Sequence, residues 1–459
     1  MWNLAFSGFG GCRRGDIGRA DFPVCIPCVV ASFPQRFQFV FASSVPSFCA
    51  MRRPSPWLVL VVVFLGAYIL REPRFQRMED GFLNWFMEHA EGVLPPAHVT
   101  LVEMGREDFQ RLTPLDEAKP LPKGQAARRS LSPLEYALSL QAVMEFQPTV
   151  IALEPVVIWR DRDKDQVQVF IDQAMRVPKL LVGIELGGRG QQDLSPDDVP
   201  SFPNVTGNRG DLAAFSGIKR QPDDDIRLIS TPGFVNLPSG RSDRIRVPLL
   251  FEYRGEIVPS LPLQAIMLWL RITPAEVKIQ LGSRIILPNG WQIPIHRDGT
   301  VTINPIAKQS VRRLTLSQLL LLAEEHEKHR PPSLTIDNLK DQIVLLRLAG
   351  DPLQPSNLFA TAIATIQNNA YVRPAPWAVP WLIILAAALL SCFLWMISKP
   401  NLVLGAIMFV AGYALFTLSL LATDRVWVPV FLPLALVGFL LVTRLVVPGP
   451  TQKPAAGEG

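Results

Sequence analysis

Three apolar stretches near the C-terminal end contain no Asp, Glu, Lys, Arg or His, and they constrain the fold more than any other feature. They are residues 377–397, 402–422 and 426–443. A helix needs about 20 apolar residues to cross the hydrocarbon core of a bilayer. Because only short polar connections separate the three stretches, the sequence predicts three antiparallel transmembrane helices rather than buried helices of a soluble domain.

A fourth apolar stretch, residues 54–70, follows Arg52 and Arg53 near the N-terminal end. Its length also suits a secretory signal peptide, but no clear cleavage site of small residues follows it. We therefore expect an uncleaved transmembrane signal anchor. Positively charged residues that flank a span stay on the cytoplasmic side, so the two arginines predict that the chain enters the membrane from inside.

With four spans, the side of the membrane on which every other segment lies is determined. Residues 71–375 are expected outside as one large domain, whereas Lys399 and a short disordered tail, residues 444–459, are expected inside. The sequence thus predicts a multi-pass protein of the bacterial inner (cell) membrane. The lipid bilayer is an expected partner of this protein, and the large domain is expected to face the periplasm or the extracellular side.

The first fifty residues differ from the rest of the chain. Four of the five cysteines lie there, including Cys25 and Cys28 in a C-x-x-C pattern. Such a pair is found at metal and redox sites. However, residues 1–50 show no helical or strand periodicity, and Met51, followed by two arginines and an apolar stretch, resembles a natural start. We therefore expect residues 1–50 to be a mis-called or disordered extension.

Composition argues against a nucleic-acid-binding protein. Charged residues make up 19% of the chain, whereas a typical soluble domain has about a quarter. The net charge of +5 is spread along the sequence without a long basic run. Nucleic-acid binding favours a clustered basic face, so we expect no nucleic-acid partner.

The large outer domain alternates strand and helix patterns. This alternation predicts an α/β domain with a mixed, partly parallel sheet, and the very apolar stretch 342–348 is expected to be a central strand. The segment 187–219 is rich in glycine and turn residues and is expected to be a solvated loop. Expected strands are 98–103, 149–154, 179–185, 246–253, 285–287, 300–304 and 342–348, and expected helices are 75–90, 133–146, 167–175, 315–323 and 358–367.

Several ordered motifs of the outer domain resemble one known family. They are 149–154, which ends in an acidic residue, then 233–238 followed by Asp243 and Arg246, and later Asp298-Gly299. Together with the membrane plan, they resemble the second type of CHASE domain, the sensor associated with bacterial cyclases and histidine kinases. The resemblance covers roughly residues 99–374. It implies an extracytoplasmic sensor with one anchor before it and three membrane helices after it.

Three positions depart from the pattern of this family. Glu103 and Glu154 stand where the family has Asp, and Arg347 stands where it has glycine at the end of the last strand. A His-Ala pair expected in the last helix is also missing. These departures predict a divergent member whose ligand pocket is altered or lost.

Glu103 and Glu154 form the leading candidate site. Both end predicted strands, and ligands of open α/β sheets bind at the carboxyl ends of strands. If the two strands are adjacent and parallel, the carboxylates meet and could hold a ligand. Alternatively, backbone amides or Arg246 satisfy them and their role is structural. The full set of candidate ligand-binding residues is Glu103, Glu154, Asp243, Arg246 and Asp298.

No residue pattern indicates catalysis, a metal site or a cofactor. His326-Glu-Lys-His329 lacks the H-E-x-x-H spacing, and the charged residues around it indicate a solvated helix end instead. The chain is therefore expected not to be an enzyme. The buried ionisable residues that transporters use are also missing from the four apolar stretches.

The functional hypothesis is a membrane-bound extracytoplasmic sensor that lacks its own output domain, because the tail after Thr443 is too short to fold. Such a protein is expected to bind a small molecule or protein outside, to form a homo-oligomer, and to signal through a separate kinase or cyclase. The alternative is a non-catalytic scaffold of the cell envelope or an accessory subunit of a membrane complex.

Overall fold

The computed structural model describes most of the chain after residue 55. The contacts divide the chain into two units, Met1–Arg53 and Pro54–Gly459, and everything described below belongs to the second. The expected N-terminal extension, Asp243, His329 and the end of the expected tail lie outside the described residues. The described ranges are 56–89, 94–105, 108, 131–159, 163–188, 199–237, 245–328, 339–349, 357–394 and 397–446.

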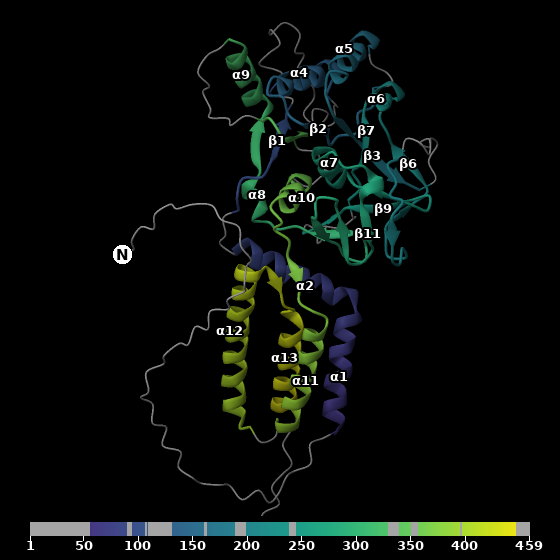
Figure 1. The fold of residues 1–459 in the computed structure, drawn as a ribbon. Coiled ribbons are helices and arrows are strands. Elements are labelled where there is room, and N and C mark those ends of the chain that lie inside the picture. The colour runs from purple at the N-terminus through teal and green to yellow at the C-terminus, as the bar shows by residue number, and fades with distance from the viewer. Residues whose placement is uncertain are drawn as a thin grey trace, which may run out of the picture. The chain divides into compact units, whose positions relative to one another are not determined.

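A mixed sheet forms the centre of the α/β domain (Figure 1). Its strand order is β15-β1-β16-β2-β3-β6, and β7 also pairs with β3. All pairs are parallel except β3 with β6, so the prediction of a mixed, partly parallel sheet with 342–348 near its centre is confirmed. The strands are β1 (Val99–Met104), β2 (Val150–Leu153), β3 (Leu180–Gly187), β6 (Gly217–Arg220), β7 (Thr231–Phe234), β15 (Arg312–Thr315) and β16 (Ile343–Leu348).

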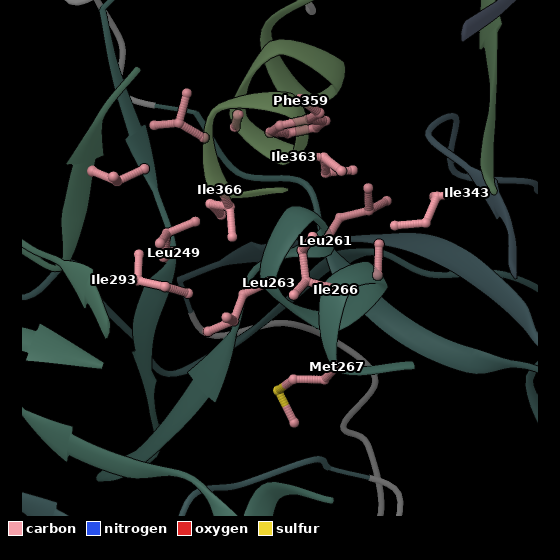
Figure 2. Close-up of a cluster of buried hydrophobic side chains, with 14 of the residues drawn as sticks. Leu249, Leu261, Leu263, Ile266, Met267, Ile293, Ile343, Phe359, Ile363 and Ile366 are labelled. Atoms are coloured by element: carbon pink, nitrogen blue, oxygen red, sulfur yellow. The ribbon is translucent and has the colours of Figure 1, made fainter. Parts of the chain in front are cut away.

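Helices cover both faces of this sheet. Helices α7 and α10 lie on one face, and α4, α5 and α9 lie on the other. The buried side chains of each group pack against strand residues that alternate between the two faces. Leu101 of β1 belongs to the first cluster and its neighbour Val102 to the second. Figure 2 shows Leu261 of α7 and Ile363 of α10 within the first cluster. The helices are α4 (Pro133–Met144), α5 (Lys164–Ala174), α7 (Leu261–Leu270), α9 (Leu316–Glu327) and α10 (Leu358–Gln367).

Local capping explains where two of these helices begin. Ser132 and Glu135 form a reciprocal capping box at the start of α4, and Thr315 and Gln318 do the same at α9. Each box satisfies backbone N–H groups that have no partner inside the helix. Shorter helical segments are α6 (Asp224–Leu228), η3 (Pro274–Glu276) and α8 (Ala307–Ser310).

Small sheets complete the domain and correct two expectations. The segment 187–219 is not simply a solvated loop, because β4, β5 and most of β6 lie within it and Phe202 and Leu212 are buried in the core. The single strand expected at 246–253 is two strands that are separated by Leu249. The strand orders of these sheets are β10-β9-β5, β13-β12-β11-β4, β14-β8 and β17-β18. Their strands are β4 (Val205–Thr206), β5 (Ala214–Phe215), β8 (Arg246–Pro248), β9 (Leu250–Tyr253), β10 (Glu256–Pro259), β11 (Lys278–Gln280), β12 (Arg284–Ile286), β13 (Gln292–Pro294), β14 (Thr300–Thr302), β17 (Arg373–Pro374) and β18 (Val426–Trp427).

Each of the four predicted spans contains an apolar helix, and one of these helices has spanning length. The span expected at 426–443 becomes helical only at Phe431, because its first residues form β18. Lys399–Thr423, within α12, is long and apolar enough to cross a membrane by length and composition, whereas α1, α11 and α13 are shorter apolar helices of 16 residues each. Helix length therefore does not confirm the four-span plan. The helices are α1 (Pro56–Arg71), α2 (Pro73–His89), α11 (Ala378–Phe393), α12 (Lys399–Asp424) and α13 (Phe431–Val446).

The apolar helices pack closely on one another. One buried cluster joins Val62 of α1, Ile384 of α11 and Leu436 of α13. At Gly66 of α1, a Cβ atom would lie only 2.7 Å from Cγ1 of Ile384. The close contact between α1 and α11 thus favours glycine at this position, since a larger residue would force the Ile384 side chain or a helix to shift.

Candidate ligand-binding site

The carboxyl ends of β1 and β2 do not meet as predicted. β16 lies between the two strands, and Arg347 of β16 is in register with Glu103 of β1. On its other side, Arg347 Nε lies 4.0 Å from Glu154 Oε2, and the two side chains are 6% and 4% exposed. An arginine of the same chain therefore separates the two predicted carboxylates.

This arrangement gives Glu154 a partner that sequence reasoning did not name. Arg246 was predicted as a possible partner of Glu154, but it pairs with Asp80 instead. Glu154 forms its buried ion pair with Arg347. Gly183 of β3 makes the surroundings tight, because a Cβ atom there would lie 2.4 Å from the backbone oxygen of Glu154. The sheet edge at which α/β proteins bind ligands is thus occupied here by a buried arginine, and ligand binding by the two glutamates stays a prediction.

Arg246 and Asp298 do come together, in a cavity of about 730 Å³. Arg246 of β8 donates from Nη2 to Asp80 Oδ1 of α2 at 2.8 Å. Asp298 precedes β14, and its Oδ1 accepts from the backbone N and the hydroxyl of Thr300 at 3.1 and 2.7 Å. The first contact ties the α/β domain to α2, and the second fixes the turn that leads into β14.

His296 lies between these groups. Its Nε2 is 2.7 Å from Thr302 Oγ1, and Thr302 is the register partner of Arg246. Burial and then the charge of Arg246 lower the pKa of His296 to about 4, although Asp298 acts in the opposite direction. The imidazole is therefore neutral at neutral pH.

Apolar side chains line the remaining wall of the cavity. Phe75 of α2 stacks on Phe431 of α13 with ring centroids 5.2 Å apart, and Trp427 packs edge-on against Phe86. Leu70 at the end of α1 lies on the same wall. The cavity thus has one charged side and one apolar side.

Glu79, next to Asp80 on α2, contacts the start of α13. The backbone N–H groups of Val430 and Phe431 donate to its two carboxylate oxygens at 2.7 and 2.9 Å. A carboxylate at a helix N-terminus satisfies free amides and interacts favourably with the helix dipole. Burial nevertheless raises the pKa of Glu79, against the lowering effect of those hydrogen bonds.

Sequence reasoning missed both α2 carboxylates as site residues. The helical pattern at 75–90 was recognised, but Asp80 lies 166 positions from Arg246, and Glu79 lies 351 positions from Val430. No local motif signals a contact over such a separation.

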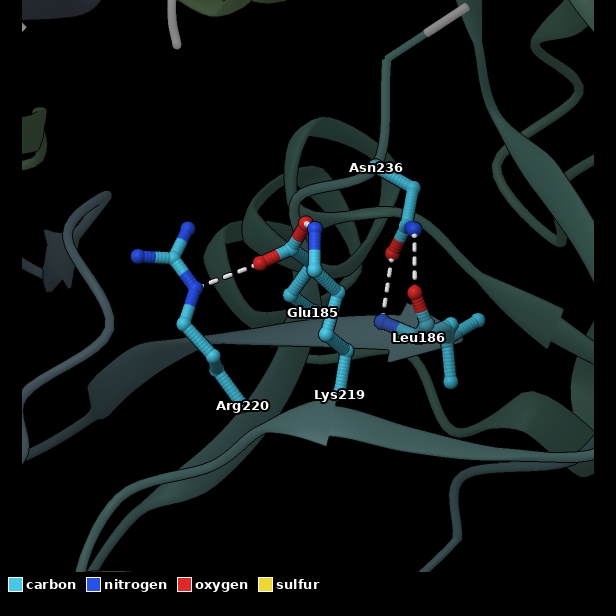
Figure 3. A network of polar contacts seen from close by, with 5 residues as sticks. All are labelled: Glu185, Leu186, Lys219, Arg220 and Asn236. Atoms are coloured by element: carbon cyan, nitrogen blue, oxygen red, sulfur yellow. Dashed lines mark hydrogen bonds and ion pairs between the residues drawn. The ribbon is translucent and has the colours of Figure 1, made fainter. Parts of the chain in front are cut away.

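A second polar cluster binds two strands together (Figure 3). Glu185 of β3 accepts from Lys219 and Arg220 of β6 at 2.8 and 2.5 Å, and the Asn236 side chain bonds to both the N–H and the C=O of Leu186. Burial raises the pKa of Glu185, but the hydrogen bonds and the positive charges of Lys219 and Arg220 together outweigh that effect, and the pKa is lowered. Its contacts indicate a structural cluster.

Metal ligation finds no support among the residues that the structure places. Within the described ranges, no group of three or more His, Cys, Asp or Glu side chains is arranged to hold a metal ion. His326 lies 4.0 Å from Glu145 with its side chain largely exposed, which agrees with the solvated helix end expected there.

Comparison with known proteins decides the family. A family model of the CHASE2 domain matches residues 58–399. The chain belongs to the CHASE2 family. The match starts in α1 and ends at the first residue of α12, so it includes α2 and the whole α/β domain. No curated protein and no solved structure matches the chain. CHASE2 domains are extracytoplasmic sensory domains, so the predicted resemblance and its sensory class are confirmed.

Proposed function

We propose that this CHASE2 protein is a membrane-anchored sensor in which α2 couples the α/β domain to the membrane helices. The observation that carries the proposal is the pair of neighbouring carboxylates on α2. Asp80 binds Arg246 of the α/β domain, while Glu79 binds the first amides of α13. Any displacement of β8 that moves α2 therefore acts directly on the start of a membrane helix.

The proposed topology has four spans, α1, α11, α12 and α13, with the α/β domain outside a bacterial inner membrane. The three 16-residue helices extend about 24 Å each at 1.5 Å per residue. A hydrocarbon core of about 30 Å accommodates shorter spans by thinning locally, and interfacial aromatic residues assist. Trp377 stands just before α11 and is 81% exposed, as suits an aromatic residue at the lipid headgroups.

The proposed output is mechanical rather than catalytic. The protein would act as a homo-oligomer and pass helix movements to a separate kinase or cyclase, the enzymes with which CHASE-type sensors are associated. The coupling through α2 supports this role over that of a passive scaffold, because a scaffold does not require a link between β8 and α13.

Reporter fusions test the topology. A fusion at Gly187 should be active only for a periplasmic reporter, and a fusion at Lys399 only for a cytoplasmic one. A fusion at Asp424, the last residue of α12, should again report the outside. A cytoplasmic signal at Gly187 would contradict the proposal.

The coupling itself needs a second measurement. Hydrogen exchange of the Val430 and Phe431 amides should quicken when Arg246→Gln removes the contact between β8 and Asp80. Unchanged exchange with the topology intact would favour the envelope scaffold instead.

A further inference from the structure

The cavity lies where three apolar helices end. Its apolar wall contains Leu70 from the last turn of α1, Pro380 from the first turn of α11, and Phe431 and Leu432 from the first turn of α13. In the topology proposed above, all of these helix ends face outside. The cavity therefore lies at the boundary between the outer leaflet and the α/β domain.

The opposite wall carries both signs of charge. Guanidinium groups come from Arg246 and Arg297, and carboxylates come from Glu79, Asp80, Asp211 and Asp298. Glu79 is engaged by backbone amides at the start of α13, and Asp80 by Arg246, whereas Asp211 and Arg297 are exposed. A ligand that carries only one charge would match half of this wall and be repelled by the other half.

The guanidinium group of Arg246 has more N–H donors than its contact with Asp80 uses. Nη2 bonds to Asp80, but the buried Nε has no hydrogen-bond partner among the described residues. Buried side-chain donors are nearly always hydrogen bonded, so an orphaned guanidinium nitrogen beside a cavity indicates an acceptor supplied by a ligand. Arginine matches the geometry of phosphate oxygens especially well.

We propose that this cavity binds the headgroup of an outer-leaflet phospholipid that carries both a phosphate and a primary amine. Arg246 and Arg297 hold the phosphate, and Asp211 and Asp298 hold the amine. The glycerol and the upper acyl chains lie against the apolar wall. A volume of about 730 Å³ is within the usual range for ligand pockets, about 300–1,000 Å³.

Charge complementarity selects this headgroup over others. A phosphatidylglycerol headgroup has the phosphate but no amine, so Asp211 and Asp298 would oppose it. A phosphatidylcholine headgroup has a cation without N–H donors, which cannot donate to the carboxylates. The bound phosphate would share Arg246 with Asp80, so lipid occupancy acts on the same contact that links β8 to α2.

The test uses the full chain purified in detergent, and it rests on the proposed membrane topology. Its thermal midpoint is followed while phosphatidylethanolamine, phosphatidylglycerol, phosphatidylcholine or soluble phosphoethanolamine is added. A ligand that binds only the folded protein raises the midpoint by mass action. Phosphatidylethanolamine should give a saturable rise, and the other three additives should give little.

Two variants assign the response to the cavity. Asp211→Asn and Arg297→Gln change exposed wall residues, so the fold should persist while the apparent affinity for phosphatidylethanolamine falls about tenfold or more, as expected for a lost hydrogen bond to a charged group. Asp225→Asn and Arg284→Gln are matched controls, because they change exposed residues outside the cavity and should respond like the wild type.

Three outcomes would overturn the lipid site. They are equal stabilisation by phosphatidylethanolamine and phosphatidylglycerol, wild-type behaviour of both wall variants, and a full response to soluble phosphoethanolamine, which would indicate a water-soluble ligand. None of these outcomes alters the result of the reporter fusions. A failed lipid site is therefore distinguishable from a failed topology.

Discussion

Arg246 Nη2 lies 2.8 Å from Asp80 Oδ1, and this ion pair joins β8 to α2 across 166 positions of the chain. The carboxylate side chain is 11% exposed and the arginine 26% exposed, so solvent screens the pair less than it screens a surface pair. Its position between the sensory domain and α2 makes its strength the first quantity to measure.

A double-mutant cycle of Asp80→Asn and Arg246→Gln should give a coupling energy of about 1.5–3 kcal/mol, the range for hydrogen bonds to charged groups. Chemical denaturation of the two single variants and the double variant measures it. Asp224 and Arg227 on α6 form a more exposed pair and serve as the control, with an expected coupling below about 1 kcal/mol. Equal couplings for the two pairs would mean that α2 is not specially held.

Glu79→Gln should lose less stability than Glu79→Ala, which should lose about 0.5–2 kcal/mol. Glutamine keeps one oxygen that can accept from Val430 or Phe431, but its NH2 group cannot accept the second N–H bond that the carboxylate takes. Alanine instead leaves the amides of Val430 and Phe431 without an acceptor. Denaturation at pH 7, together with exchange rates of the two amides, checks both expectations.

The same group predicts a pH dependence of stability. Because the pKa of Glu79 is higher folded than unfolded, the protonated carboxyl contributes stability below about pH 4.5 that is lost as the pH rises through the folded pKa. Glu79→Gln should remove this component of the thermal midpoint profile. Parallel profiles for the two proteins would contradict the raised pKa.

Arg347→Met should destabilise the fold by about 3–5 kcal/mol, because it leaves the buried Glu154 without its cation. The double variant Arg347→Met with Glu154→Gln should recover most of that loss, since no buried charge remains. Denaturation midpoints of the three proteins decide the matter. If Glu154→Gln alone were neutral and the double variant no better than Arg347→Met, the ion pair would not be the source of the effect.

Because of His296, we expect the folded protein to lose stability on acidification. Its folded pKa of about 4 lies below the ordinary value of 6.5, so the unfolded state binds the extra proton between these values. Stability should be fully present above pH 6.5 and fall towards pH 4, by up to about 1.4 kcal/mol per pH unit. His296→Gln should flatten this part of the profile while keeping a hydrogen bond to Thr302. An unchanged profile would show that the imidazole titrates normally.

Local patterns predicted many of the helices and strands, including some that are almost wholly buried. The helix 358–367 has the same bounds in the structure as α10, and 342–348 is confirmed as a central strand. In contrast, α7 (Leu261–Leu270), whose first seven residues are also all buried, was not predicted.

The candidate site depended on strand order, which sequence patterns do not reveal. Glu103 and Glu154 were expected on adjacent strands, but β16 lies between them, so Arg347 separates them. Arg246 was predicted as a candidate ligand residue, and that role stays a prediction, whereas its partner Asp80 was visible only as one polar position of an amphipathic helix. Asp243 lies outside the described residues, so its role stays a prediction.

The central position of β16 has a consequence for biogenesis. A ribosome makes β1 and β2 long before it makes Ile343–Leu348, yet β16 pairs with both of them. Until that strand emerges, the two earlier strands have open edges that could pair with other chains. The sheet closes last at its centre, and pairing over so long a sequence separation is slow. A nascent or truncated chain that stops before Ile343 would therefore be a split sheet in need of a chaperone.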